Sequence, residues 1–272
     1  MEKMTMNTNR RSPKTLAAAA ILLSAISASA GTTVPSLTSP MPVASVVPEW
    51  HWRIGLDAWV QALEGDITLR GRNAEVDLSM DDVLDNLDFA AMGVLEVGCG
   101  RWSFVADMNY AELSGSTSTR LTYNTLDLKQ FIGHFVVAYK VLENGCTHLD
   151  VYAGALVNWV DAELTIDLHG PFGRRTRDFN ASGSEIWVDP IIGARVQQEL
   201  SDKFFFRAAG DVGGFGVSSD FTWQTTAMFG YRVCEGGSVV LGYRGIGTDY
   251  EDGDTSYNCI NHGPLLGVEY KF

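Results

Sequence analysis

Positive charge is scarce in this sequence. Its 20 Lys and Arg residues stand against 33 Asp and Glu residues, which gives a formal net charge of −13. Nucleic-acid binding requires basic side chains that neutralise phosphates, so this balance excludes a nucleic-acid partner. Charged residues make up only 19 % of the chain and hydrophobic residues 46 %. Over 272 residues, that composition excludes a disordered protein and predicts a domain with a sizeable interior.

Cysteines and long apolar runs are also few. Four cysteines are too few to make a small disulfide-stapled scaffold. The apolar run 16–26 follows Arg10, Arg11 and Lys14 and precedes the small residues 28–30. It is shorter than the roughly 20 residues that a membrane-spanning helix needs, and it is typical of a signal peptide over residues 1–30. No later segment is long and apolar enough to span a membrane as a helix.

Export permits disulfide bonds, and the predicted turns decide which cysteines can meet. Cys99 and Cys146 fall in turns of neighbouring predicted hairpins, so theirs is the one pair that we consider. Whether they are bonded stays open.

Residues 31–48 hold four of the eight prolines and no charge, which is typical of an extended arm. Residues 49–272 then form a single domain.

Apolar and polar residues alternate in most of that domain. Residues 50–62 place apolar side chains on one face and mostly polar ones on the other, which a β-strand does and a helix does not. The same period predicts ten strands, with eight as the alternative, near 50–63, 89–99, 102–114, 126–140, 149–162, 185–200, 203–217, 220–233, 238–248 and 262–272. Ser79 followed by Asp82 also predicts the start of a short helix between the first two strands.

The connections between these strands differ in length. Those after even-numbered strands are short and turn-like, whereas most of those after odd-numbered strands are long and polar, beginning near 64, 114, 163 and 247. A transmembrane β-barrel has this asymmetry, although a soluble barrel or sandwich also has alternating strands. Aromatic residues favour the membrane barrel because they gather at the two strand ends. The predicted aromatic girdles contain Trp50, Trp52, Trp102, Tyr110, Trp159, Trp223 and Tyr231.

With the signal peptide and the alternating strands, the last residues carry a family resemblance. Leu266, Val268, Tyr270 and Phe272 alternate with Gly267, Glu269 and Lys271, and the chain stops on the aromatic residue. The chain therefore resembles Gram-negative outer-membrane β-barrel proteins of the broad OmpA/OmpW-like class. The resemblance implies an antiparallel up-and-down transmembrane barrel over about residues 50–272. It also implies that the four alternating residues form the signal read by the barrel-assembly machinery.

The inward faces of the predicted strands carry both signs of charge. An unpaired charge inside a narrow barrel is costly, so these groups must pair or be hydrated. We expect Arg195, Arg207 and Arg244 to lie among Asp189, Asp211 and Glu269. Two interpretations are possible: a selective polar pore, or a lumen plugged by its own ion pairs. The plug is favoured because side chains fill small barrels. The predicted network contains Arg53, Asp57, Glu96, Asp107, Asp189, Arg195, Arg207, Asp211, Arg232, Arg244 and Glu269.

These patterns predict an envelope-structural or small-solute pore role. The alternatives are a surface adhesin that uses segments 64–88 and 163–184 and, third, an outer-membrane hydrolase with His169 and His262 in outer loops. No nucleophile, base and acid have suitable spacing, so we predict no catalytic residues, and likewise no cofactor or metal. The expected partners are outer-membrane lipid, the barrel-assembly machinery and small polar solutes. We expect a monomer.

Overall fold

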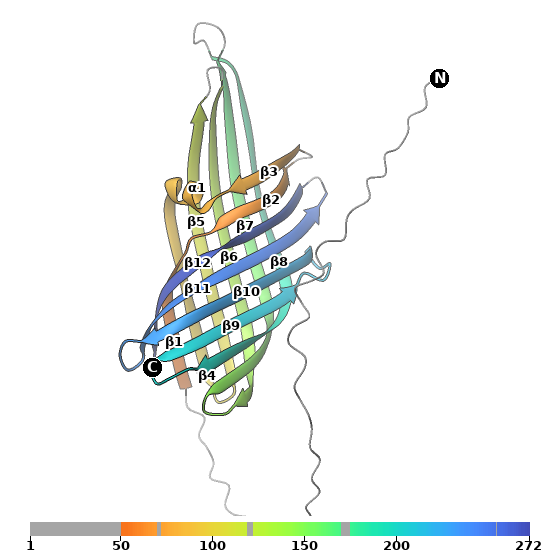
Figure 1. The fold of residues 1–272 in the computed structure, drawn as a ribbon. Coiled ribbons are helices and arrows are strands. Elements are labelled where there is room, and N and C mark those ends of the chain that lie inside the picture. Colours follow the sequence, from red (N-terminus) through yellow and green to blue (C-terminus); the bar gives the residue numbers. More distant parts are fainter. Residues whose placement is uncertain (1–49, 70–71, 119–121, 170–174, 254) are drawn as a thin grey trace, which may run out of the picture. The chain divides into compact units, whose positions relative to one another are not determined.

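Ten antiparallel strands form the barrel of residues 50–272 in the computed structural model (Figure 1). The structure describes residues 50–69, 72–118, 122–169, 175–253 and 255–272, so the predicted signal peptide over 1–30 and the predicted arm over 31–48 lie outside the described residues. The barrel strands are β1 (Trp50–Trp59), β4 (Leu87–Cys99), β5 (Trp102–Ser118), β6 (Thr122–Glu143), β7 (Thr147–His169), β8 (Arg175–Glu199), β9 (Phe204–Gly213), β10 (Ser219–Arg232), β11 (Gly237–Asp252) and β12 (Thr255–Lys271).

Each strand pairs with its neighbours in chain order, and the last strand returns to the first. β1 pairs with β12 in a ladder that runs from Arg53–Lys271 to Trp59–Leu265. This pairing closes the sheet and leaves no barrel strand without two neighbours. The prediction of an up-and-down barrel with ten strands is therefore confirmed, and the eight-strand alternative is wrong.

The first strand is longer than predicted and is interrupted once. β2 (Ala62–Leu69) continues along β12 in the same register as β1, and β3 (Arg72–Leu78) folds back on β2 as a hairpin. The break at Val60 and Gln61 lies opposite Pro264, which has no N–H to donate to the ladder. A Cβ on Gly263 would overlap the carbonyl oxygen of Val60, so the glycine permits this close approach.

A helix, α1 (Met80–Asp85), links β3 to β4. The predicted start is confirmed because Ser79 is the N-cap and forms a capping box with Asp82. The Ser79 hydroxyl donates to the Asp82 carboxylate at 2.6 Å, and this bond, with one from the Ser79 backbone, lowers the pKa of that carboxyl. The helix ends before Leu87, which is the first residue of β4 rather than a further helical position.

The long polar loops predicted at one end of the barrel are wrong. β6, β7 and β8 have 22, 23 and 25 residues, and much of the sequence assigned to loops continues these strands. β11 and β12 likewise run to within a few residues of each other. Polar residues can extend a ladder where both faces meet water, and a search for an apolar face misses such extensions. We call this end the hairpin end. The opposite end, with the turns at 100–101, 144–146, 200–203 and 233–236, is the turn end.

The outer surface of the barrel carries an uncharged band. Outward side chains between Trp102 and Tyr110 on β5 are uncharged, and the next outward residue is Glu112. Glu112 pairs with Lys129 on β6, which pairs with Asp161 on β7, so one row of charges limits the band. An uncharged band around a closed sheet is the architecture of an outer-membrane β-barrel, which confirms the predicted transmembrane barrel fold. Among the described residues, no helix is long and apolar enough to cross a membrane.

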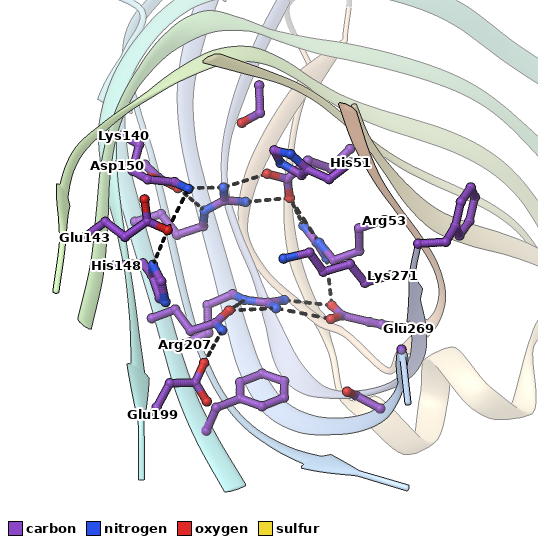
Figure 2. A pocket seen from close by; sticks show the side chains of 18 of the residues that line it. His51, Arg53, Lys140, Glu143, His148, Asp150, Glu199, Arg207, Glu269 and Lys271 are labelled. Atoms are coloured by element: carbon purple, nitrogen blue, oxygen red, sulfur yellow. Dashed lines mark hydrogen bonds and ion pairs between the residues drawn. The ribbon is translucent and has the colours of Figure 1, made fainter. Parts of the chain in front are cut away.

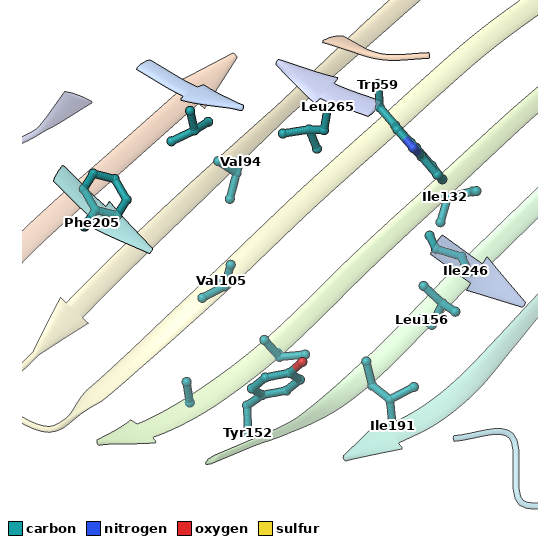
Figure 3. Packing of buried hydrophobic residues seen from close by; sticks show 13 residues of the cluster. Trp59, Val94, Val105, Ile132, Tyr152, Leu156, Ile191, Phe205, Ile246 and Leu265 are labelled. Atoms are coloured by element: carbon teal, nitrogen blue, oxygen red, sulfur yellow. The ribbon is translucent and has the colours of Figure 1, made fainter. Parts of the chain in front are cut away.

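Apolar side chains also fill part of the interior. Thirteen buried residues, among them Trp59, Leu156 and Ile191, form one cluster inside the barrel (Figure 3). A second cluster closer to the hairpin end contains Leu63 and Trp187. Apolar packing therefore occupies part of the same lumen as the charged groups.

Candidate functional site

The lumen near the turn end is crossed by a network of ion pairs. Arg53 on β1 donates to Glu96 on β4 at 3.0 and 2.6 Å and to Glu269 on β12 at 2.8 Å. From the far wall, Arg195 on β8 donates to the same Glu96 at 3.0 and 2.8 Å. Arg195 also donates to Asp150 on β7 at 2.7 Å. Two arginines thus share one carboxylate across the lumen.

A third arginine completes this layer. Arg207 on β9 donates to both carboxylate oxygens of Glu269, at 2.7 and 3.2 Å, and to the side-chain oxygen of Gln197 at 3.1 and 3.0 Å. Its guanidinium lies 5.3 Å from the centre of the Phe205 ring. We call Arg53, Glu96, Asp150, Arg195, Arg207 and Glu269 the partition.

A second ion pair lies closer to the middle of the barrel. Arg244 on β11 bonds to Asp107 on β5, and its Nη1 donates to Asn109 at 3.3 Å. Asn109 in turn donates to Asp107 at 2.9 Å, and the Arg244 guanidinium lies 5.5 Å from the centre of the Trp59 ring. Buried charges are tolerated when they are paired and hydrogen-bonded, and this pair meets both conditions.

The structure places all eleven predicted charges on inward positions of their strands but pairs them differently from our expectation. Of the pairs expected among the three arginines, only Arg207–Glu269 forms. Asp189 instead accepts from the hydroxyl of Ser219 at 2.7 Å. It lies six residues from Arg195 on β8, which is about 20 Å along a strand. The alternation pattern predicts whether a side chain faces inward or outward, but not its position along the barrel axis.

Three other predicted members lie outside the partition. Asp211 accepts from the Tyr152 hydroxyl at 2.9 Å and lies 3.2 Å from His134 Nε2. Arg232 pairs with Glu199 at 2.6 Å. Asp57 has no ion-pair partner among the described residues. The prediction missed Asp150 and Glu199, although both alternate with outward side chains in their strands and could have been found by that signal.

On the turn-end side of the partition lies a cavity of about 620 Å³, which we call the vestibule (Figure 2). Its floor is formed by partition residues, and its rim includes His51, Lys140, Glu143, His148 and Lys271. Beyond the partition lies a second cavity of about 80 Å³. Arg53, Arg195, Arg207 and Glu269 line both cavities, so a single layer of ion pairs separates them.

Aromatic side chains fill the lumen toward the hairpin end. The rings of Trp187 and Tyr250 are stacked with centroids 4.6 Å apart, and Tyr257 lies 5.4 Å from Trp187. The Tyr257 hydroxyl donates to Asn261, and Asn261 donates to Gln61. These groups come from β8, β11, β12 and the break between β1 and β2, so they connect opposite walls.

The predicted girdle and terminal residues all lie on the outer face. Near the turn end, Trp102 packs on Tyr139 with ring centroids 4.8 Å apart, and Phe204 packs on Tyr231 at 5.0 Å. Nearer the hairpin end, the Tyr110 and Trp159 rings are stacked at 6.4 Å. The remaining predicted positions, which are exposed or partly exposed, are Trp50, Trp52, Trp223, Leu266, Val268, Tyr270 and Phe272.

The structure also places His262 and the four cysteines. His262 was expected in an outer loop, but it lies in β12 on the outer wall, where Nδ1 is 2.6 Å from the Tyr243 hydroxyl and Nε2 is 3.3 Å from Glu64. All four cysteines are free, including Cys99 and Cys146. No group of three or more His, Cys, Asp or Glu side chains suited to a metal ion occurs in the part of the chain that the structure describes.

Three solved structures that resemble this chain are of varied kinds. The outer membrane protease OmpT from Escherichia coli is 11 % identical, with 82 % of this chain and 96 % of that chain covered and a TM-score of 0.49. Ail, the attachment invasion locus protein of Yersinia pestis, is 10 % identical, with 84 % and 100 % covered and a TM-score of 0.30. The Pseudomonas putida toluene transporter TodX is 10 % identical, with 82 % and 89 % covered and a TM-score of 0.32. No family profile and no curated protein matches the chain.

Proposed function

We propose that this protein is a plugged outer-membrane barrel with a structural role in the cell envelope. In this proposal the turn end faces the periplasm, as the predicted signal peptide and arm require, and the hairpin end faces outward. The observation that carries the proposal is the partition, whose ion pairs join β1, β4, β7, β8, β9 and β12 across the lumen.

The partition favours a plug over a pore because its arginines and glutamates pair with one another. Glu96 accepts hydrogen bonds from both Arg53 and Arg195, and Glu269 accepts from both Arg53 and Arg207. A solute that passes must separate these pairs, and separation leaves buried charges without a partner, which is costly. The aromatic groups around Trp187 form a second barrier nearer the hairpin end.

Solute entry into proteoliposomes tests this proposal. Vesicles that contain the full chain are mixed with an isosmotic solution of a small neutral sugar, and swelling is followed by light scattering. A plugged barrel gives the slow swelling of protein-free vesicles. Swelling as fast as that produced by an open porin at the same protein density would contradict the plug and favour the small-solute pore.

The strand extensions support a second candidate, a surface interaction protein. β5, β6, β7 and β8 continue past the charged row at Glu112, Lys129 and Asp161 and pair with one another there. An ordered sheet beyond the membrane band is a surface on which a partner can bind. Deleting residues 118–122, which connect the paired parts of β5 and β6 in the chain, should leave barrel folding intact and abolish adhesion of expressing cells to a host-cell or matrix surface. Unchanged adhesion would contradict this candidate.

A further inference from the structure

The vestibule holds a large share of the basic residues of an acidic protein. Seven of the 20 Lys and Arg residues line it, against five Asp and Glu side chains, in a chain whose net charge is −13. Its volume of about 620 Å³ lies within the range of small-molecule sites, about 300–1,000 Å³. Cations gathered in a concave site attract anions, because low-dielectric walls focus their field.

Most of these cations already have partners. Arg53, Arg195 and Arg207 are held by carboxylates of the partition. At the rim, Arg232 pairs with Glu199 at 2.6 Å and Lys140 pairs with the exposed Glu143 at 3.1 Å. Within the described chain, Arg101 and Lys271 form no ion pair, and both line the vestibule.

Lys271 has no ion-pair partner among the residues that the structure describes, although it lies next to another cation. It lies directly opposite Arg53 in the β1–β12 ladder, and like charges at opposed positions destabilise a sheet. Arg53 is compensated because its guanidinium turns to Glu96 and Glu269. Lys271 follows the inward phase of Glu269, and its side chain points into the vestibule (Figure 2). Phe272 also lines the vestibule, and its backbone oxygen accepts a hydrogen bond from the Trp52 backbone N–H at 2.8 Å.

We propose that the vestibule binds a small soluble oxyanion, with two or more carboxylate or phosphate groups, that enters from the turn end. Lys271 and Arg101 supply the two cations that lack a partner, and the ligand offsets the repulsion between Lys271 and Arg53. The partition forms the floor, so the ligand binds without crossing the barrel. This inference needs no conducting lumen and therefore stands or falls separately from the plugged-barrel proposal.

Titration calorimetry on the full chain in lipid nanodiscs at low ionic strength tests the site. The probes are citrate for carboxylates, tripolyphosphate for phosphates and spermidine as a cationic comparison. We expect citrate, tripolyphosphate or both to bind, with affinity that falls as salt is added, and spermidine not to bind. Which anion binds more tightly identifies the oxyanion chemistry.

Matched variants locate the binding. The double variant Arg101→Gln, Lys271→Gln should weaken anion binding at least about tenfold. Lys203→Gln removes an exposed cation at the same end that does not line the vestibule, and it should change the affinity less than twofold. Lys271→Arg retains the charge and should retain binding, which separates a lost site from a misfolded barrel. Absence of anion binding, equal binding of spermidine, or an equal loss in Lys203→Gln would overturn the proposal.

Discussion

Arg195 and Glu96 come from strands on different sides of the barrel and form a two-bonded ion pair across the lumen, at 3.0 and 2.8 Å. Because β4 and β8 are separated by three strands in the sheet, this pair connects parts of the wall that the backbone ladder does not join directly. The barrel is therefore held together by its interior charges as well as by its closed sheet.

Removing Arg195 should destabilise the barrel. Arg195→Ala leaves Asp150 without its ion-pair partner and Glu96 with only Arg53, and loss of one member of a buried pair costs about 3 kcal/mol. Urea unfolding in lipid vesicles measures the change. Glu143→Gln, at an exposed pair, is the control and should have almost no effect. Equal stability of the two variants would show that the partition does not stabilise the fold.

The assigned outer face makes a prediction about lipid contact. Ala155 faces outward on β7 between Leu149 and Trp159, so Ala155→Arg should cost about 2–4 kcal/mol of folding free energy in a bilayer. Ser201→Arg, in an exposed turn, should cost almost nothing. Folding titrations in lipid vesicles compare the two. If both variants fold equally well, the inward and outward faces are assigned the wrong way round.

The break in the first strand depends on close backbone approach. A Cβ on Gly263 would overlap the Val60 carbonyl oxygen, so Gly263→Ala should destabilise the barrel by about 1–3 kcal/mol. Gly210→Ala is the matched control because its Cβ would meet its nearest neighbour at an ordinary 3.6 Å. Thermal unfolding of the two variants gives the comparison. If Gly263→Ala is as stable as Gly210→Ala, the Val60 carbonyl does not approach Gly263 as closely as described.

The last residue should matter for assembly. The Phe272 N–H donates to the Trp52 carbonyl at 2.9 Å, and the Trp52 N–H donates back at 2.8 Å, so Phe272 helps to join β12 to β1. Deleting Phe272 should sharply lower the amount of protein in the outer membrane. Val217→Ser, which changes an exposed apolar residue at the other end, should leave that amount unchanged. Normal levels of the deletion variant would contradict this role.

The cap of α1 should titrate at low pH. Hydrogen bonds from Ser79 lower the pKa of Asp82, so this carboxylate stabilises the helix above its ordinary pKa, and the stabilisation is lost as pH falls through the lowered value. In Ser79→Ala the pKa of Asp82 should rise toward that of an ordinary aspartate. Side-chain NMR titration measures both values. An unchanged pKa in the variant would show that the capping box is not formed in solution.

Sequence periodicity predicted the strand number, the inward face of every charge in the network and the outer position of the aromatic residues. It did not predict which charges meet, because Asp189 and Arg195 share a face yet lie far apart along β8. It also ended β7 too early and began β8 too late, since their polar extensions are stabilised by pairing with each other rather than by an apolar face. The break between β1 and β2 could not be predicted, because it depends on their register with β12, which places Val60 opposite Pro264. No local sequence pattern gives that register.

Single-channel recording in planar bilayers tests the plugged lumen most directly. The wild-type chain should insert without stable conductance steps, and Arg195→Ala should conduct once Trp187→Ala also removes the second barrier, because the two changes together remove the ion pairs between the two lumen cavities and the aromatic packing nearer the hairpin end. Large, stable conductance steps in the wild type that Arg195→Ala leaves unchanged would contradict the plug and identify an open pore.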